Sequence, residues 1–281
     1  MNIKACAKLN LTLDILRKRE DGFHDLQMVM QSVALCDELT VTPARGEGAM
    51  STNLSYLPAD GRNLAQMAAA AFREATGKGG EVDISIEKNI PVCAGMGGGS
   101  SDAAAVLRAM NDMTGAGLSL AELAKIGERV GSDVPYCVLG GTALAEGRGE
   151  ILTPLPPLPH CRVVICKPAF PISTPQLFGK VDVRKIVRRP DTAGLMTALE
   201  QGDLLGVARR LYNVFEDVLE PRKKAEIDSI KAAMIDCGAL GASMSGSGPT
   251  VFGLFDDEKS AREAVTRLGE LYKNVYLTET V

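Results

Sequence analysis

The chain opens with a run in which apolar and polar residues alternate, the pattern of a strand with one buried face. The apolar residues share one parity from position 3 to position 15. Lys8 and Asn10 have the opposite parity, so we expect their side chains to point away from the core. Taken alone, this feature is equally typical of a solvated strand face.

Hydrophobic periodicity and helix-capping residues predict a mixture of strands and helices along the rest of the chain. The expected strands lie at 26–35, 39–41, 82–86, 142–145, 162–167 and 251–255, with one more at the C-terminal end. The expected helices lie at 64–75, 103–113, 120–130, 191–200, 203–219 and 223–236, with one more starting at Thr174 and another before the last strand.

A proline-rich segment divides this series of elements. Residues 154–159 contain four prolines, and proline fits neither a helix interior nor a central strand. We therefore expect a linker at this position. No internal repeat divides the chain further, so the sequence predicts two α+β domains, at 1–155 and 160–281.

Composition and charge exclude several classes of function. The 281 residues include 31 Lys and Arg against 35 Asp and Glu, and only 4% are aromatic. This balance provides neither the basic surface nor the stacking rings that nucleic-acid binding requires. The N-terminus lacks an apolar signal core, and the longest uncharged run, 237–255, has five glycines, three serines and a proline, too polar for a membrane span. We expect a cytoplasmic monomer or homodimer with small-molecule substrates and no nucleic-acid or membrane partner.

The seven cysteines are scattered along the chain and form no CxxC pair and no cluster with histidine. Zinc sites are built from such pairs and clusters, so no zinc site is expected. Most of these cysteines should instead be small, buried apolar residues in a reducing cytosol.

The most distinctive segment reads PVCAGMGGGSSD over residues 91–102, between a predicted strand and an Ala-rich helix. Its glycines are entropically costly unless the backbone takes unusual angles or approaches a ligand closely. Backbone N–H groups and the positive end of the helix dipole face such a loop, so a phosphate is the expected occupant. The alternative is a ligand-free turn with a serine cap, which does not need three adjacent glycines. Neither the Walker A spacing nor the dinucleotide spacing fits.

Two further segments share this polar, flexible character: 7–10 in the first strand and the Gly/Ser-rich segment 241–250, which also suits a plain hairpin connection. Together, and in this order, the three segments resemble the three motifs of the GHMP kinases. Within that family the chain resembles the members that phosphorylate a CDP-linked methylerythritol, through KACAKLNL at 4–11, DGFHDL at 21–26, GSDVP at 131–135 and AEGRGE at 145–150. The resemblance covers essentially the whole chain. Cys93, Ala94 and Met96 stand where relatives more often have Gly and Leu.

The resemblance implies the two-domain α+β fold of the GHMP kinases. Its N-terminal domain is similar to ribosomal protein S5 domain 2, and its C-terminal domain is ferredoxin-like, with the active site in the cleft between them. It also implies ATP-dependent phosphorylation of a tertiary 2-hydroxyl in non-mevalonate isoprenoid synthesis.

Three other functions fit the pattern less well. Another GHMP kinase, acting on homoserine or mevalonate, is disfavoured by segments 21–24 and 174–178, which match the cytidylyl-binding members. A non-catalytic nucleotide-binding protein is disfavoured because both Lys8 and Asp133 are present. A serine hydrolase is disfavoured because the chain has no GxSxG segment and only two histidines.

The resemblance also implies a pair of catalytic residues. Asp133 is the expected base, and a nearby Lys8 ammonium would keep it ionised and stabilise the developing charge. Without the resemblance, an N-cap or turn role is a common one for an aspartate placed between Ser132 and Val134. Asn10 is expected to contact the substrate beside Lys8.

The ATP triphosphate is expected to lie over the glycine segment, with Mg²⁺ bridging the phosphates and with no protein ligand assigned to the metal. The residues expected to hold it are Pro91, Val92, Cys93, Ala94, Gly95, Met96, Gly97, Gly98, Gly99, Ser100 and Ser101.

The second substrate is expected to bind through aromatic and polar residues from two segments. The resemblance places His24 at the cytosine, with Phe23 beside it as a further substrate-binding residue, and assigns Thr174 and Phe178 to a cytidine-binding segment. The alternatives are a solvated loop position for His24 and a core helix position for Phe178.

Overall fold

The computed structural model describes residues 1–281, and these form two compact units that alternate along the chain. Unit 1 contains residues 1–7, 35–92 and 97–140. Unit 2 contains residues 8–34, 93–96 and 141–281. Two long strands, β1 (Asn2–Lys18) and β2 (His24–Pro43), contribute residues to both units. The domain division at residues 155–160 stays a prediction.

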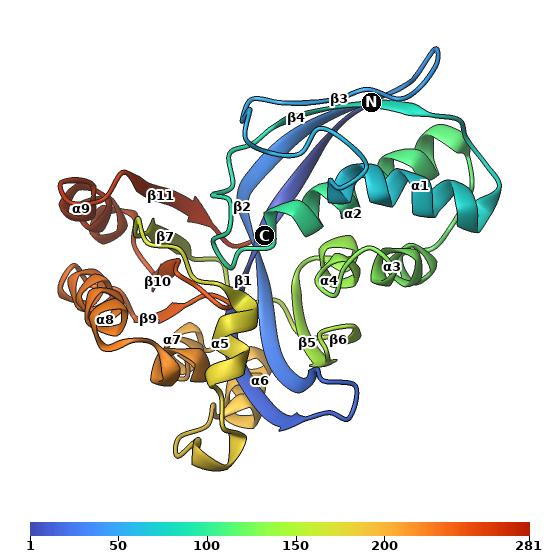
Figure 1. The fold of residues 1–281 in the computed structure, drawn as a ribbon. Helices are drawn as coiled ribbons and strands as arrows, with labels where there is room; N and C mark the ends of the chain where they lie inside the picture. Colours follow the sequence, from blue (N-terminus) through green and yellow to red (C-terminus); the bar gives the residue numbers. More distant parts are fainter. The chain divides into compact units, whose positions relative to one another are not determined.

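Unit 1 packs helices beside a few short strands. The central helix α2 (Gly98–Thr114) contacts the other three, and Figure 1 shows α1 and α2 side by side. Every residue from Ser101 to Leu107 is buried, because the alanines of this helix allow its neighbours to approach closely. The other elements are β3 (Met50–Thr52), α1 (Leu64–Thr76), β4 (Val82–Glu87), α3 (Leu120–Glu128) and α4 (Val134–Leu139).

Unit 2 contains a four-stranded sheet in the order β11-β7-β10-β9, with all neighbours antiparallel. Helices α8 and α9 pack on this sheet and lie on the same side of it in Figure 1. The elements concerned are β7 (Arg162–Lys167), α8 (Pro221–Asp236), β9 (Gly241–Met244), β10 (Val251–Phe255), α9 (Glu258–Gly269) and β11 (Asn274–Glu279).

The remaining elements of unit 2 lie along β1 and β2. Residues 26–31 of β2 pair with β5, which in turn pairs with β6, and residues 12–13 of β1 pair with β8. These elements are β5 (Thr142–Gly147), β6 (Ile151–Pro154), α5 (Thr174–Lys180), a 3-10 turn at Val183–Lys185, α6 (Thr192–Glu200), α7 (Leu204–Ala208), β8 (Tyr212–Asn213) and a second 3-10 turn at Val214–Val218.

Most of the predicted elements are confirmed, and so is the α+β class. Helix α1 begins after the Asn63 cap and ends at Gly77, and α3 begins with a complete capping box formed by Ser119 and Glu122. Strands β4, β7 and β10 lie where alternation predicts them. None of the helices combines the length and the apolar character that crossing a bilayer demands.

Strand β1 differs from the prediction, because both of its faces are buried. Lys8, Asn10, Thr12 and Asp14 are all at most 5% exposed. Their polar groups find partners within the protein; for example, the Thr12 hydroxyl accepts a hydrogen bond from the Val29 amide. The expectation of a single buried face is therefore wrong.

Three other boundaries also differ from prediction. The strands expected at 26–35 and 39–41 form one strand, β2, because its first part pairs with β5 and its last part pairs with β4. Helix α2 begins at Gly98 instead of residue 103. The helix expected at 203–219 is broken after α7, where Asn213 turns its side chain onto other backbone groups.

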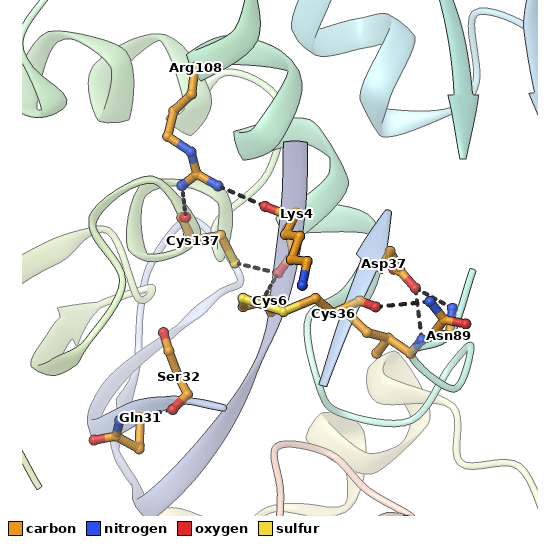
Figure 2. The surroundings of a disulfide bond; sticks show 11 residues. Lys4, Cys6, Gln31, Ser32, Cys36, Asp37, Asn89, Arg108 and Cys137 are labelled. Carbon is orange, nitrogen blue, oxygen red and sulfur yellow. Dashed lines mark hydrogen bonds between the residues drawn. A yellow bond between two sulfur atoms is a disulfide. The ribbon is translucent and has the colours of Figure 1, made fainter. Parts of the chain in front are cut away.

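The cysteines follow the expectation only in part. Four are buried, at positions 137, 161, 166 and 237, and burial raises the pKa of the Cys161 and Cys166 thiols to about 12. Cys93 is exposed. Cys6 of β1 and Cys36 of β2 form a disulfide bond, which Figure 2 shows with its surroundings. The sequence did not predict this bond.

Reduction of the Cys6–Cys36 bond should lower the free energy of unfolding by about 2–4 kcal/mol, because the bond restricts the unfolded chain across a separation of 30 residues. In a protein of this size that corresponds to a fall in Tm of roughly 3–7 °C. Calorimetry with and without dithiothreitol measures it.

Two variants control this measurement. Cys6→Ser/Cys36→Ser should melt at the lower temperature under both conditions, whereas Cys93→Ser should respond to the reductant as the wild type does. Equal melting temperatures of oxidised and reduced wild type would show that the bond does not stabilise the fold.

Candidate functional site

The first part of the glycine segment belongs to unit 2 and rests on two other segments of that unit. The Lys8 amide donates a hydrogen bond of 3.0 Å to the Met96 carbonyl. The Ser245 hydroxyl donates one of 2.9 Å to the Gly95 carbonyl. Gly95 adopts φ +75°, and a Cβ at this position would lie 2.2 Å from the Ser245 carbonyl oxygen, so only glycine fits.

Two polar residues of β1 are bonded to each other and to the segment that contains Ser245. Lys8 Nζ donates a hydrogen bond of 2.8 Å to the side-chain oxygen Oδ1 of Asn10. The backbone amide of Asn10 donates one of 3.2 Å to Ser245 Oγ. Lys8 is only 4% exposed and Asn10 is fully buried. The predicted residues Lys8, Asn10, Gly95 and Met96 therefore lie together in unit 2, with Ser245 as a further neighbour.

A tight turn at residues 245–249 completes this group. The Gly248 amide donates to the Ser245 carbonyl, and Gly246 adopts φ +56° beside the Gly95 carbonyl. The buried Asn213 side chain donates to the Met244 and Gly246 carbonyls at 2.7 and 2.8 Å. Asn213, which is not part of the turn in the sequence, therefore holds its backbone in place. Sequence reasoning missed it, because no local pattern separates it from the helix expected there.

The second part of the glycine segment starts helix α2 in unit 1. Gly97 occupies the N-cap position with φ +69°, and no side chain caps the helix. The amides of the first turn therefore lack the usual side-chain acceptor, and the positive end of the helix dipole lies with them. The Ser101 hydroxyl is committed elsewhere, because it donates a hydrogen bond of 2.6 Å to the Cys6 carbonyl.

Asp133 lies in the same unit, at the N-cap position of α4. Its side chain makes no capping hydrogen bond, although the residue lies in the turn that the Val134 amide closes by donating to the Gly131 carbonyl. The other end of α4 is held by Arg108 of α2, which donates to the Cys137 and Val138 carbonyls at 2.8 and 3.3 Å. Helices α2 and α4 are thus fixed to each other. Lys8 belongs to the other unit, and its approach to Asp133 stays a prediction.

An aromatic cluster in unit 2 contains two of the residues assigned to the second substrate. The rings of His24 and Phe178 are stacked, with centroids 5.1 Å apart and an angle of 22° between the planes. Phe215 meets Phe178 edge-on at 4.9 Å. Burial, with a smaller contribution from the charge of Lys18, lowers the pKa of His24 below its usual 6.5, so its ring is neutral at pH 7.

The two other substrate residues lie near these groups in different ways. The Thr174 hydroxyl is 2.6 Å from the Ser247 hydroxyl, which connects α5 to the turn at 245–249. Phe178 is on the same helix. Phe23 is largely exposed, and the Arg148 guanidinium lies 5.4 Å from its ring centroid. Unit 2 thus joins Lys8, Asn10, Gly95 and Thr174 through a single turn.

A buried charge cluster in unit 1 was also missed from the sequence. Lys88 donates hydrogen bonds to the carboxylates of Asp37 and Asp102. Of these three residues, only Asp102 lies in a segment that the sequence singles out, because it follows Ser100 and Ser101 at the end of the glycine segment. No group of three His, Cys, Asp or Glu side chains is arranged to hold a metal ion.

Comparison with known proteins gives matches along the whole chain. Residues 63–141 match the GHMP kinases N terminal domain, and residues 195–274 match the GHMP kinases C terminal domain. A 4-diphosphocytidyl-2-C-methyl-D-erythritol kinase of Clostridium botulinum (strain Eklund 17B / Type B) is 44% identical over 281 residues, which is 100% of both chains. One from Clostridium novyi (strain NT) is 45% identical, again over 100% of both chains.

Solved structures match the fold in the same way. A crystal structure of 4-(cytidine 5'-diphospho)-2C-methyl-D-erythritol kinase superposes with a TM-score of 0.83 at 33% identity, covering 100% of this chain and 99% of that one. A homoserine kinase from Cytophaga hutchinsonii gives 0.74 at 20% identity, covering 100% and 94%. The second likeness concerns the fold alone. The predicted two-domain GHMP kinase fold is confirmed.

The close approach of Gly95 to Ser245 makes a testable demand on stability. Gly95→Ala should destabilise the protein by roughly 1–2 kcal/mol for the left-handed backbone, and by roughly 1–3 kcal/mol more for the clash. Gly202→Ala is the matched control, since Gly202 has φ +65° and nothing within 4 Å of the added Cβ. Urea unfolding compares the two, and equal losses would show that the turn at 245–249 yields to the methyl group.

Proposed function

The chain belongs to the family of 4-diphosphocytidyl-2-C-methyl-D-erythritol kinases, a branch of the GHMP kinases, and we propose that it phosphorylates the 2-hydroxyl of 4-diphosphocytidyl-2-C-methyl-D-erythritol. As a member of this family the chain is a small-molecule kinase, with ATP as its co-substrate. The reaction is a step in non-mevalonate isoprenoid precursor synthesis. The observation that most supports the proposal is the 44% identity over the full length of both chains.

The nucleotide phosphates are assigned to the start of α2. The amides of Gly98, Gly99 and Ser100 lie in the first turn of a helix that no side chain caps. Anions bind at such N-termini through the N–H groups and the helix dipole. ATP enters as its magnesium complex. The chain offers no cluster of three acidic or histidine side chains, so phosphate oxygens and water would supply most of the metal's ligands.

Asp133 is assigned as the base and Lys8 as its electrostatic partner. The Asp133 carboxylate would take the proton of the 2-hydroxyl as that oxygen attacks the γ-phosphorus and ADP leaves. A tertiary alcohol is a weak acid, so the charge that develops on its oxygen needs stabilisation. Lys8 is suited to this because it is almost fully buried and is oriented by Asn10.

The cytosine of the acceptor is assigned to the aromatic cluster around Phe178. With centroids 5.1 Å apart, His24 and Phe178 leave no space for a base between them, since stacked rings lie about 3.5 Å apart on each side. A base that stacks on this face of Phe178 would therefore displace the His24 ring, which could then donate or accept a hydrogen bond at the edge of the base. The neutral state of His24 provides both a donor and an acceptor.

Acceptor specificity tests the proposed function directly. ADP release should be measured in parallel with 4-diphosphocytidyl-2-C-methyl-D-erythritol, homoserine and mevalonate at equal concentrations. The cytidylyl compound should support turnover, and the other two should not exceed the rate without acceptor. Turnover with homoserine or mevalonate alone would refute the proposal, although the chain would remain a GHMP kinase.

Asp133→Asn should keep the KM for ATP and lower kcat by roughly 10²–10⁴-fold, the usual contribution of a positioned base. Lys8→Ala should act on the same step, so the double variant should lose less than the product of the two single effects. Asp257→Asn is the control, because Asp257 is an N-cap that accepts from Ser260 and asparagine also caps well. Near-normal turnover of Asp133→Asn would exclude this residue as the base.

Phe178→Ala should raise the KM for the cytidylyl substrate by about 5–150-fold, because a base–aromatic stack contributes about 1–3 kcal/mol. The KM for ATP should not change. Phe170→Ala is the control, since Phe170 belongs to the same unit but faces Lys223 instead of His24. An unchanged KM for the cytidylyl substrate would place the base elsewhere.

A further inference from the structure

The glycine segment is held at its first end by one buried carboxylate. Asp37 of β2 is fully buried, and its Oδ1 accepts hydrogen bonds from the amides of Asn89 and Ile90 at 2.6 and 2.7 Å. The Asn89 side chain adds a bond of 3.1 Å to the Cys36 carbonyl, and Figure 2 shows Asp37 and Asn89 facing each other. The residues directly before Pro91 are therefore fixed to β2.

The same cluster reaches the other end of the segment. Lys88 Nζ donates to Asp37 Oδ2 and, at 2.5 Å, to Asp102 Oδ2 in the first turns of α2. The Lys88 side chain is only 5% exposed. A Cβ on Gly98 would lie 3.5 Å from Lys88 Nζ, so the ammonium lies directly against the start of the helix.

We propose that Asp37, Lys88 and Asp102 form a positioning clamp that holds both ends of the segment 91–101 and so sets the geometry of the amides that receive the nucleotide phosphates. The inference rests on the proposed function of this segment as the ATP site. The three side chains act through the backbone of the loop. The clamp joins β2, the residues after β4 and α2, which are otherwise separate along the chain.

The charge of the clamp depends on Asp102. Burial raises the pKa of Asp102, the charge of Lys88 lowers it and the nearby Asp37 raises it, and the resulting pKa is about 7. One carboxylate oxygen, Asp102 Oδ1, is buried without a hydrogen-bond partner, so ionisation there is costly. With Asp102 protonated the three side chains are neutral in sum, and with Asp102 ionised they carry one negative charge beside an anion site.

Asp102→Asn separates positioning from mere folding, because asparagine has the same shape, can still accept from Lys88 and cannot ionise. As the pH rises from 6 to 8, ionisation of Asp102 should raise the wild-type KM for ATP about three- to tenfold relative to this variant. The ratio of the two KM values removes the ionisation of ATP itself. At pH 6 the two proteins should agree within about twofold.

The same substitution predicts a pH effect on stability. A carboxyl whose folded pKa exceeds its usual value stabilises the native state at low pH, and this contribution is lost as the pH rises through the folded pKa. The wild-type Tm should therefore fall relative to that of Asp102→Asn between pH 6 and pH 8. If the difference in Tm and the ratio of KM values between wild type and Asp102→Asn both stayed constant from pH 6 to pH 8, the role of Asp102 in the clamp would be refuted.

Two further variants test the other members of the clamp. Asp37→Asn and Lys88→Met should each raise the Kd of a non-hydrolysable ATP analogue at least tenfold by calorimetry, and hydrogen exchange at the amides of 97–101 should become faster. Glu81→Gln is the control, since it breaks the ion pair with Arg73 in the same unit without touching the loop. Folded variants with unchanged Kd would refute the clamp.

The clamp and the proposed function can be refuted independently of each other. Analogue binding needs no acceptor, so wild-type protein that binds the analogue but does not phosphorylate the cytidylyl compound would refute the proposed function and leave the clamp standing. Wild-type protein that binds no nucleotide would refute both.

Discussion

Strand β1 carries polar side chains into the interior of unit 2, and the rest of the site there depends on how each of them is satisfied. A buried polar group without a partner costs several kcal/mol. Lys8 Nζ donates to Asn10 Oδ1, Asn10 Nδ2 donates to Met28 Sδ, and Arg189 donates to Asp14 at 2.6 Å. The backbone amide of Asn10 donates to Ser245 Oγ. The turn at 245–249 is thus a structural requirement of the strand as well as a part of the site.

The glycine segment also depends on its neighbours, because other segments fix its backbone. Its glycines allow the backbone angles that the segment needs, but they make few contacts of their own. Residues 95 and 96 are therefore held by Ser245 and Lys8, and Ser101 is held by the Cys6 carbonyl. A loop that must present its amides to an anion cannot also use them for internal bonds, so other segments have to fix its shape.

Sequence reasoning located the elements and the conspicuous residues, because these leave local signals. The capping box at Ser119, the alternation at 82–86 and the adjacent glycines at 97–99 are each visible within a short window. Partners distant in the chain leave no such signal. Asn213 acts on residues more than 30 positions away, and Asp37 acts on residues more than 50 positions away, so neither could be identified before the fold was known.

The buried second face of β1 was mispredicted for a related reason. Alternation reports only which side chains are apolar, and a polar residue on the other face reads as solvent-exposed unless its partner is known. The disulfide between Cys6 and Cys36 was missed because pairing needs two cysteines on adjacent strands, and spacing alone does not reveal adjacency. In each case the missing information concerned tertiary contacts and not local preference.

The residues assigned to phosphoryl transfer and those assigned to the acceptor are held in place in different ways, and this difference bears on how one fold can accept different substrates. The groups that would serve phosphoryl transfer are tied into the fold by hydrogen bonds: Lys8 is buried and bonded to Asn10, and the partly exposed glycine segment is held by Ser245 and Cys6. The groups assigned to the acceptor base are held mainly by ring contacts, with His24 and Phe178 half-buried and Phe23 and Thr174 exposed. A change at His24 or Phe178 would leave the hydrogen bonds of Lys8, Gly95 and Ser101 in place, so residues proposed to select the acceptor could change without loss of the fold.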